Sequence, residues 1–132
     1  MSDNCTIMVV NASQRQKDKF RAHMPDWRIR EAEFDPSGTV RLIGEPEPIS
    51  HVLVFALNEK EETLALCRNA QACAGQGRVP LLLAISRYQI ALGNVARRLE
   101  RTDFIIRPFT TAEVCDKLHA LSAESTDSAR EA

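Results

Sequence analysis

The sequence predicts an α/β domain built on a doubly wound, five-stranded parallel sheet. One observation is the apolar run Val-Leu-Val-Phe-Ala at residues 52–56, which has the length of a strand and is too short to span a membrane. The run does not alternate with polar residues, so we expect both of its faces to be buried, as in the middle of a parallel sheet. A second observation is that strand and helix patterns alternate along most of the chain. Its 132 residues are enough for one domain with its own core.

The N-terminal part predicts a strand followed by a short helix. Residues 6–10, Thr-Ile-Met-Val-Val, form the first apolar run. Ser13, with Gln16 three residues later, matches a capping box and predicts a helix over residues 14–24. Pro25 ends this helix, because the residue before a proline is disfavoured in the helical conformation.

A hairpin is predicted where the alternation would otherwise place the second helix. Residues 27–34 and 39–43 alternate apolar with polar side chains, and Asp35-Pro-Ser-Gly38 between them is a strong turn sequence. Residues 44–48, Gly-Glu-Pro-Glu-Pro, then predict an extended connector, since two prolines forbid a helix.

The rest of the chain predicts three further helices and two further strands. Asn58 is the expected cap of a helix that ends at Gly75 and Gly77. A helix over residues 87–99 contains Gly93, which weakens it by roughly 1 kcal/mol relative to alanine. Thr110 and Glu113 form a capping box at the start of the last helix. The two strands are expected at residues 79–85 and 103–106, the domain at 1–121, and a polar tail or linker at 122–132.

Right-handed crossovers between these elements predict the flavodoxin-like strand order 2-1-3-4-5. Ligands of such sheets bind at the carboxyl ends of the strands. The carboxyl end of the central strand, Phe55-Ala56-Leu57-Asn58, carries no carboxylate, thiol or imidazole. The sequence is therefore more informative about architecture than about activity.

Composition excludes several classes of function. Hydrophobic residues make up 44% and charged residues 27% of the chain, and the net charge of −1 gives no reason to expect nucleic acid or an anionic membrane. No apolar run approaches the ~18 residues of a membrane span, and the N-terminus lacks a signal-peptide pattern. We therefore expect a cytoplasmic protein.

The four cysteines are expected to be small buried hydrophobic residues. They are scattered and none forms a C-x-x-C pair, so neither a zinc site nor a disulfide framework is predicted. We expect no metal and no cofactor. The three histidines have no serine, cysteine or carboxylate partner at motif spacing, so the sequence does not predict an enzyme.

Residues 101–114, Arg-Thr-Asp-Phe-Ile-Ile-Arg-Pro-Phe-Thr-Thr-Ala-Glu-Val, resemble the end of the receiver domain of bacterial response regulators. That family ends its fifth strand with an aromatic residue, two apolar residues and Lys-Pro-Phe, followed by a capped helix. Phe104, Ile105-Ile106 and Arg107-Pro108-Phe109 occupy these positions here. The strand spacing agrees over nearly the whole chain, so the resemblance implies the receiver fold.

The resemblance also implies that the phosphorylation site has been lost. The metal-binding acids of the family match Asn11 and Ala12, and its phospho-accepting Asp matches Ala56. A methyl group cannot be phosphorylated, and one neutral amide oxygen is a poor Mg²⁺ site. The chain thus resembles a degenerate receiver, or pseudo-receiver. The positions of its degenerate pocket are Asn11, Ala12, Ala56, Ile85, Ser86 and Arg107, the last in place of the family's lysine.

What the resemblance then implies is a phosphorylation-independent signalling module that dimerises or docks on an output domain or histidine kinase. In receivers the face formed by the fourth helix, fifth strand and fifth helix commonly does so, and we expect a homodimer. The alternative is a sensor that binds a small anionic ligand in the vacated pocket, lined by Asn11, Ser13, Ala56, Ser86 and Arg107. Nucleic acid is disfavoured because acids are interleaved with the arginines of residues 87–107. The expected interaction face comprises Leu92, Val95, Arg98, Arg101, Asp103, Phe104, Glu113 and Asp116.

Overall fold

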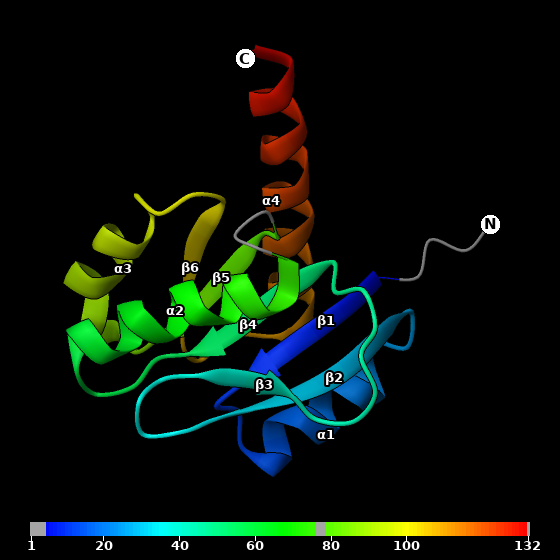
Figure 1. The fold of residues 1–132 in the computed structure, drawn as a ribbon. Helices are drawn as coiled ribbons and strands as arrows, with labels where there is room; N and C mark the ends of the chain where they lie inside the picture. The colour runs from blue at the N-terminus through cyan, green and yellow to red at the C-terminus, as the bar shows by residue number, and fades with distance from the viewer. Residues whose placement is uncertain (1–4, 76–78, 132) are drawn as a thin grey trace.

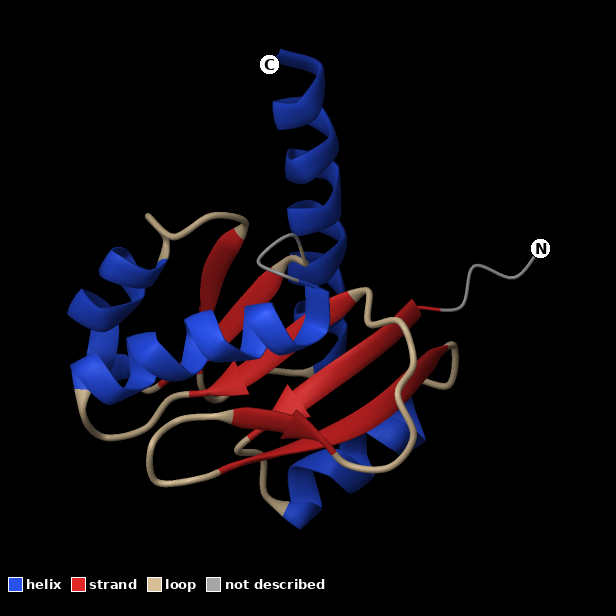
Figure 2. Cartoon of the chain, viewed as in Figure 1, coloured by secondary structure: helices blue, strands red, loops and turns tan. Residues whose placement is uncertain are grey.

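The structure, a computed structural model, describes residues 5–75 and 79–131, with side chains described as far as residue 122. Within these residues the chain forms one six-stranded sheet with helices on both sides (Figures 1 and 2). The elements in chain order are β1 (Cys5–Val10), α1 (Gln14–His23), β2 (Trp27–Phe34), β3 (Val40–Leu42), β4 (His51–Phe55), α2 (Lys60–Gly75), β5 (Leu81–Ile85), the 3₁₀ helix η1 (Arg87–Gln89), α3 (Ile90–Ala96), β6 (Thr102–Ile106) and α4 (Thr111–Glu131).

The strand order is β3-β2-β1-β4-β5-β6. All neighbouring pairs are parallel except β2 and β3, which are antiparallel. The five parallel strands therefore have the predicted order, with β1 between β2 and the central strand β4. The hairpin adds β3 as a sixth strand at one edge, while β6 lies at the other.

The hairpin is closed by the predicted turn. The Gly38 amide donates a 2.8 Å hydrogen bond to the Asp35 carbonyl, and Gly38 has a φ of 90°. Such a conformation strains residues that carry a Cβ atom, so glycine is needed here. The Asp35 carboxylate accepts hydrogen bonds from the amides of Ser37 and Thr39, both 3.0 Å long. The hairpin thus replaces a crossover helix with a locally stabilised turn.

Two hydrophobic cores lie on the two faces of the sheet. Successive side chains of a strand point to opposite faces, so Met8 and Val10 pack into one core, and Ile7 and Val9 into the other. Figure 1 shows α2 and α3 on one face and α1 and α4 on the other. The fully buried residues of β4 and β5 contribute to both cores, as the non-alternating apolar runs predicted.

The helix predicted over residues 87–99 is shorter than expected. A 3₁₀ turn, η1, comes first, and α3 covers only Ile90–Ala96. Ser86 caps η1, and the Gln89 side chain accepts a 2.9 Å hydrogen bond from the Ser86 amide, which fixes a tight turn directly after β5. The sequence pattern could not separate this turn from the helix, because both place apolar residues at similar spacing.

The tail predicted for residues 122–132 is helical as far as Glu131, whereas Ala132 lies outside the described residues. The sequence analysis did not predict a helix here, although residues 122–131 include neither glycine nor proline to break one. The C-terminal part of α4 extends past the sheet in Figure 1. The assignment of residues 1–121 as the domain remains a prediction.

Candidate functional site

The parallel strands β1, β4, β5 and β6 end at the same edge of the sheet. This is the edge at which open α/β sheets bind their ligands. The residues of the predicted pocket follow, or end, these four strands. The topology therefore brings together segments that are far apart in sequence, but their side chains have different surroundings.

Asn11 links the ends of two strands. It has a φ of 65°, a conformation that asparagine tolerates better than most residues, and it lies directly after β1. Its side-chain amide donates a 2.9 Å hydrogen bond to the carbonyl of Phe55, the last residue of β4. The neighbouring Ala12 is half-buried against the core formed with α1 and α4. Neither residue offers an anionic oxygen at this position.

Ala56 and Ile85 contribute no polar side-chain atoms to the edge. Ala56 directly follows β4 and is half-buried, and its amide donates a 2.9 Å hydrogen bond to the Ala84 carbonyl. Ile85 is completely buried at the end of β5. The structure thus has a methyl group next to the end of the central strand and Ile85 inside the core.

Ser86 has a structural role as a cap. Its hydroxyl accepts a 3.3 Å hydrogen bond from the Tyr88 amide. The side-chain nitrogen of Gln89 in turn donates a 2.9 Å hydrogen bond to the Leu57 carbonyl, in the segment that follows β4. These bonds hold the segments after β4 and β5 together. The Ser86 side chain nevertheless remains half-buried at the border of a cavity.

Arg107 follows β6 and is joined to Pro108 by a cis peptide bond. Its backbone amide donates a 2.8 Å hydrogen bond to the Ile85 carbonyl, which fixes the start of its side chain. The side chain is exposed, and among the described residues its guanidinium forms neither an ion pair nor a hydrogen bond. It is therefore available to a ligand.

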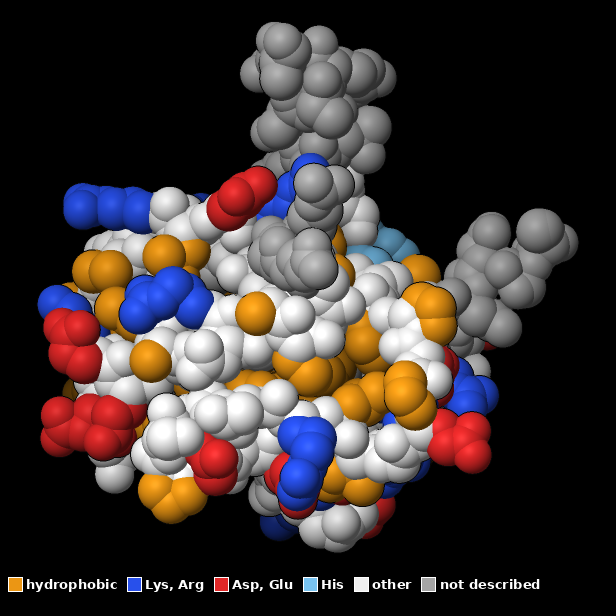
Figure 3. All heavy atoms as spheres, in the orientation of Figure 1, with side chains coloured by type: hydrophobic (Ala, Val, Ile, Leu, Met, Phe, Trp, Pro, Cys, Tyr) orange, Lys and Arg blue, Asp and Glu red, His pale blue; other side chains and the backbone are white. Residues whose placement is uncertain are grey.

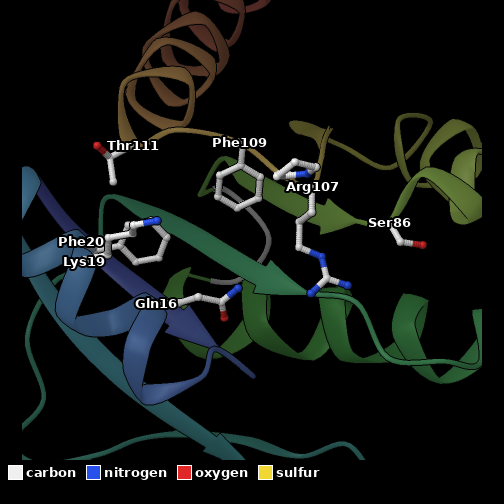
Figure 4. A pocket seen from close by; sticks show the side chains of 8 residues that line it. Gln16, Lys19, Phe20, Ser86, Arg107, Phe109 and Thr111 are labelled. Carbon is white, nitrogen blue, oxygen red and sulfur yellow. The ribbon is translucent and has the colours of Figure 1, made fainter.

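A cavity of about 460 Å³ lies beside this arginine, between α1 and the loop that joins β6 to α4. Figure 4 shows Gln16 and Arg107 reaching toward each other across it, with the ring of Phe109 between the strands and the helix α4. We call it the α1–β6 cavity. Its lining residues are Gln16, Lys19, Phe20, Ser86, Arg107, Pro108, Phe109 and Thr111.

The cavity only partly coincides with the predicted pocket. Ser86 and Arg107 line it, whereas Asn11, Ala56 and Ile85 do not. Sequence reasoning missed Lys19 and Phe20, because it treated the helix of residues 14–24 only as a packing element. The i, i+3 spacing of Gln16 and Lys19, which puts both on one side of a helix, is the signal that could have indicated them.

Several residues of the predicted interaction face pack inside the domain. Leu92 is buried in a core, and Val95 and Phe104 pack against that core. Glu113 is exposed, but it closes the capping box of α4 by accepting a 2.8 Å hydrogen bond from the Thr110 amide. The apolar spacing of Leu92 and Val95 correctly predicted one side of a helix, but that side packs against the sheet.

The charges on this face differ in their availability. The Asp103 carboxylate lies 3.2 Å from Arg97 Nε on α3 and 3.5 Å from Lys117 Nζ on α4. Arg97 also stacks over the Phe104 ring, with its guanidinium carbon 5.5 Å from the ring centroid. Asp103 therefore joins two helices to the edge strand. Arg98 and Asp116 are exposed, and Arg101 is half-buried with a φ of 54°.

Large exposed apolar side chains lie near the end of β6. Tyr88 is 82% exposed, and Ile90 and Ile106 are 39% and 38% exposed. Ile106 pairs with Ile85 in the sheet, and η1 follows Ile85 closely, so the three residues belong to neighbouring segments. We call them the β6-edge surface. The sequence analysis had not selected them.

His51 is the centre of a buried polar cluster. Its Nδ1 lies 2.9 Å from Ser50 Oγ and its Nε2 lies 2.7 Å from Ser122 Oγ, and the Trp27 ring packs against it. Burial and the nearby His119 lower the pKa of His51 to about 4. Within the described residues no carboxylate is hydrogen-bonded to this imidazole, so the cluster lacks the third member of a catalytic triad.

The expectation that all four cysteines are buried was wrong. Cys67 is fully buried, and burial raises the pKa of its thiol to about 12. Cys5 and Cys115 are half-buried, and Cys73 is exposed on α2. In the described part of the chain no three His, Cys, Asp or Glu side chains are grouped as metal ligands, and no helix there is long and apolar enough to cross a membrane.

Charges of both signs are distributed over the face shown in Figure 3. Elsewhere in the described residues, ion pairs join Lys17 and Arg21 with Glu31, and Arg28 and Arg30 with Glu47. A nucleic-acid surface instead gathers basic residues on one face. On this face the distribution agrees with the composition, which disfavoured such a partner.

Known proteins resemble this chain in structure but not in sequence. No protein-family model matches it, and no curated protein matches it. An adenylate cyclase structure from Rhodopirellula baltica aligns with a TM-score of 0.69 and 13% identity, over 97% of this chain and 94% of that one. A response regulator receiver protein from Sinorhizobium medicae WSM419 aligns with a TM-score of 0.66 and 12% identity, over 93% and 98%.

A third solved structure, the pilus assembly protein CpaE from Caulobacter crescentus CB15, aligns with a TM-score of 0.59 and 18% identity, over 88% of this chain and 92% of that one. Identities this low show the fold alone. The names of these proteins differ, so the fold by itself does not assign an activity. The comparisons and the strand order together show that the chain has a receiver-like α/β fold.

Proposed function

We propose that this chain is a pseudo-receiver, a non-enzymatic signalling module that acts in the cytoplasm through protein–protein contacts and without phosphorylation. The observation that carries the proposal is Ala56, whose methyl group follows the central strand where receivers have the phospho-accepting carboxylate. Phosphoryl transfer to a receiver requires both that nucleophile and a bound Mg²⁺. Both requirements fail at the same edge of this sheet.

The contacts of Asn11 support the loss of the metal site. Its amide nitrogen is engaged with the Phe55 carbonyl, so the side chain orients its donor, not an acceptor, toward the end of β4. Mg²⁺ requires oxygen ligands and favours carboxylates. The side chain that remains at this position therefore serves the structure of the strand ends.

The β6-edge surface supports contact with a second copy of the chain. Tyr88, Ile90 and Ile106 are large exposed apolar side chains, and Ile106 ends the edge strand β6, whose outer backbone groups have no partner strand in the described sheet. Tyrosine is enriched in protein interfaces, and edge strands readily pair with other chains. We infer that this surface forms a homodimer contact, and docking on a kinase or output domain is the alternative.

Oligomeric state tests this surface. We expect the wild-type protein to form a dimer in sedimentation equilibrium as its concentration rises, and Ile106→Lys to shift it to the monomer, because a lysine cannot be buried without a partner. Ile43→Lys is the matched control, since Ile43 is 48% exposed near the opposite edge strand, β3. A wild-type protein that stays monomeric, or equal effects of both variants, would contradict self-association through the β6 edge.

Independence from phosphorylation has a separate test. Beryllofluoride with Mg²⁺ imitates an aspartyl phosphate, so we expect it to leave the amide NMR spectrum of this protein unchanged. A receiver with an intact acidic site is the positive control. Saturable shifts at residues 10–12 and 55–57 would show that the site still binds the metal and the phosphoryl analogue, and the proposal would then be wrong.

A further inference from the structure

We propose that the α1–β6 cavity binds a small organic anion, one that carries a phosphate or carboxylate group on an apolar ring. Ala56 does not line this cavity, so the proposed binding does not depend on the residue at position 56. Its lining comes from α1, the segment after β5 and the segment after β6, and includes none of the three apolar residues of the predicted dimer contact, Tyr88, Ile90 and Ile106. The inference therefore goes beyond the proposed interaction role.

The anionic group is inferred from two uncompensated cations. Lys19 and Arg107 both line the cavity, and no lining residue is acidic. Both side chains are exposed, and neither has an ion pair among the described residues, although most other basic residues of α1 and β2 are paired. An arginine fork binds phosphate or carboxylate in a bidentate manner, and a lysine adds a point charge.

The ring is inferred from the aromatic floor. Phe20 and Phe109 line the cavity, and both pack against Phe55, with ring centroids 6.4 and 6.1 Å from it. Phe55 is the last residue of the central strand, so the floor is anchored in the core. Small-molecule sites combine such an apolar lining with a few polar groups, and the volume of about 460 Å³ is within their usual range.

Polar side chains at the border favour the anionic end of the ligand. The Gln16 oxygen accepts a 2.9 Å hydrogen bond from the Ser13 amide, which leaves the Gln16 nitrogen to donate. Figure 4 shows this amide pointing toward Arg107, with Thr111 and Ser86 at the borders of the cavity. A ligand bound here would contact both α1 and the β6–α4 loop. Phe20 of α1 and Phe109 of that loop already pack against the same residue, Phe55.

Titrations with simple probes test the site. We expect phenyl phosphate and 3-phenylpropionate to shift the NMR signals of Phe20, Phe109 and the Arg107 side chain in a saturable manner. Benzyl alcohol, which has the ring without the charge, and inorganic phosphate, which has the charge without the ring, are expected to bind at least about tenfold more weakly. The two anionic probes distinguish phosphate from carboxylate recognition.

Matched variants locate the charge requirement. Arg107→Gln and Lys19→Gln are each expected to weaken binding of phenyl phosphate about tenfold or more, because each removes a charge-assisted hydrogen bond. Arg68→Gln is the control, since Arg68 is exposed on α2 at the opposite face of the sheet. All three changes are at exposed positions, and unchanged circular dichroism confirms folding.

Three results would overturn the inference. One is the absence of saturable shifts around the cavity of the wild-type protein with both anionic probes at millimolar concentration, a result that needs no variant. Another is inorganic phosphate binding as tightly as phenyl phosphate, which shows an unspecific charge effect. The third is an equal loss of affinity in Arg68→Gln. None of them bears on phosphorylation or on dimer formation, which are measured separately.

Discussion

The side-chain amide of Asn11 donates a 2.9 Å hydrogen bond to the backbone carbonyl of Phe55, so the end of β1 is joined to the end of the central strand β4. Phe55 in turn contacts Phe20 and Phe109, which line the α1–β6 cavity. Asn11 thus holds the two strand ends together. The same connection positions the floor of the cavity.

We predict that Asn11→Ala lowers the free energy of unfolding by about 1–3 kcal/mol. A left-handed backbone costs a residue with a Cβ atom roughly 1–2 kcal/mol, and the lost hydrogen bond adds about 1 kcal/mol. Asn11→Gly keeps the backbone conformation and loses only the hydrogen bond, so its effect should be smaller. Urea denaturation measures both. Equal destabilisation by the two variants would show that the φ of 65° is not what requires asparagine.

We predict that Ala56→Asp alone does not restore phosphorylation by acetyl phosphate. The new carboxylate has no acidic neighbour at residues 11 and 12 with which to hold Mg²⁺, and the reaction depends on that ion. Intact-protein mass spectrometry after incubation with acetyl phosphate and Mg²⁺ measures the outcome. A mass increase of one phosphoryl group on the variant, absent from the wild type, would show that the loss of Asp alone silenced the site.

The architecture was predictable because its signals are local and redundant. Continuous apolar runs indicated the buried strands β1, β4 and β5, and turn and capping sequences such as those at Ser13 and Thr110 marked the ends of elements. Tail helicity was not predictable in this way, since polar residues 122–131 lack a strong signal for either state. The extent of α3 was missed because a 3₁₀ turn and an α-helix have similar spacings.

The candidate site was less predictable, because sequence position does not determine side-chain direction. The matching of strand ends located Asn11, Ala56, Ser86 and Arg107 at one edge. Sequence position could not show that the side chains of Asn11 and Ser86 form hydrogen bonds with backbone groups. Lys19 lies on the exposed side of helix α1, for which the sequence indicated only packing, and only the fold places it in the same cavity as Arg107.

Gly93 is predicted to be required for packing, although glycine lowers helix propensity. A Cβ atom at this position would lie 2.8 Å from Phe104 Cγ and 2.9 Å from Ile85 Cδ1, closer than real contacts allow. We expect Gly93→Ala to destabilise the protein by about 1–3 kcal/mol through overpacking, despite a helix-propensity gain of about 1 kcal/mol. The control Asn94→Ala, at the exposed neighbour, should be neutral or slightly stabilising. Thermal denaturation compares them, and a stabilised Gly93→Ala would contradict the close approach of α3 to β6.

Asp103 is predicted to act on stability more than on association. Asp103→Asn removes the charge that Arg97 and Lys117 share, and we expect a loss of about 0.5–1 kcal/mol, which shrinks at high salt. Asp116→Asn, at an exposed position of α4, is the control and should have little effect. Urea denaturation at low and high salt separates the two. A variant that dissociates the dimer without any change in stability would instead assign Asp103 to the partner contact.

The pKa of His51 predicts a loss of stability in mild acid. Burial and the charge of His119 lower the pKa of folded His51 to about 4, below its usual value of 6.5. Below about pH 6.5 the unfolded chain takes up a proton that the folded protein excludes until about pH 4, so folding is progressively disfavoured across this window. The free energy of unfolding should fall by up to about 1.4 kcal/mol per pH unit there. Denaturation of His51→Gln should show a smaller slope than the wild type, whereas His23→Gln, at an exposed position, should keep it. Identical slopes in all three proteins would mean that the Ser50–His51–Ser122 cluster accepts the proton without opening.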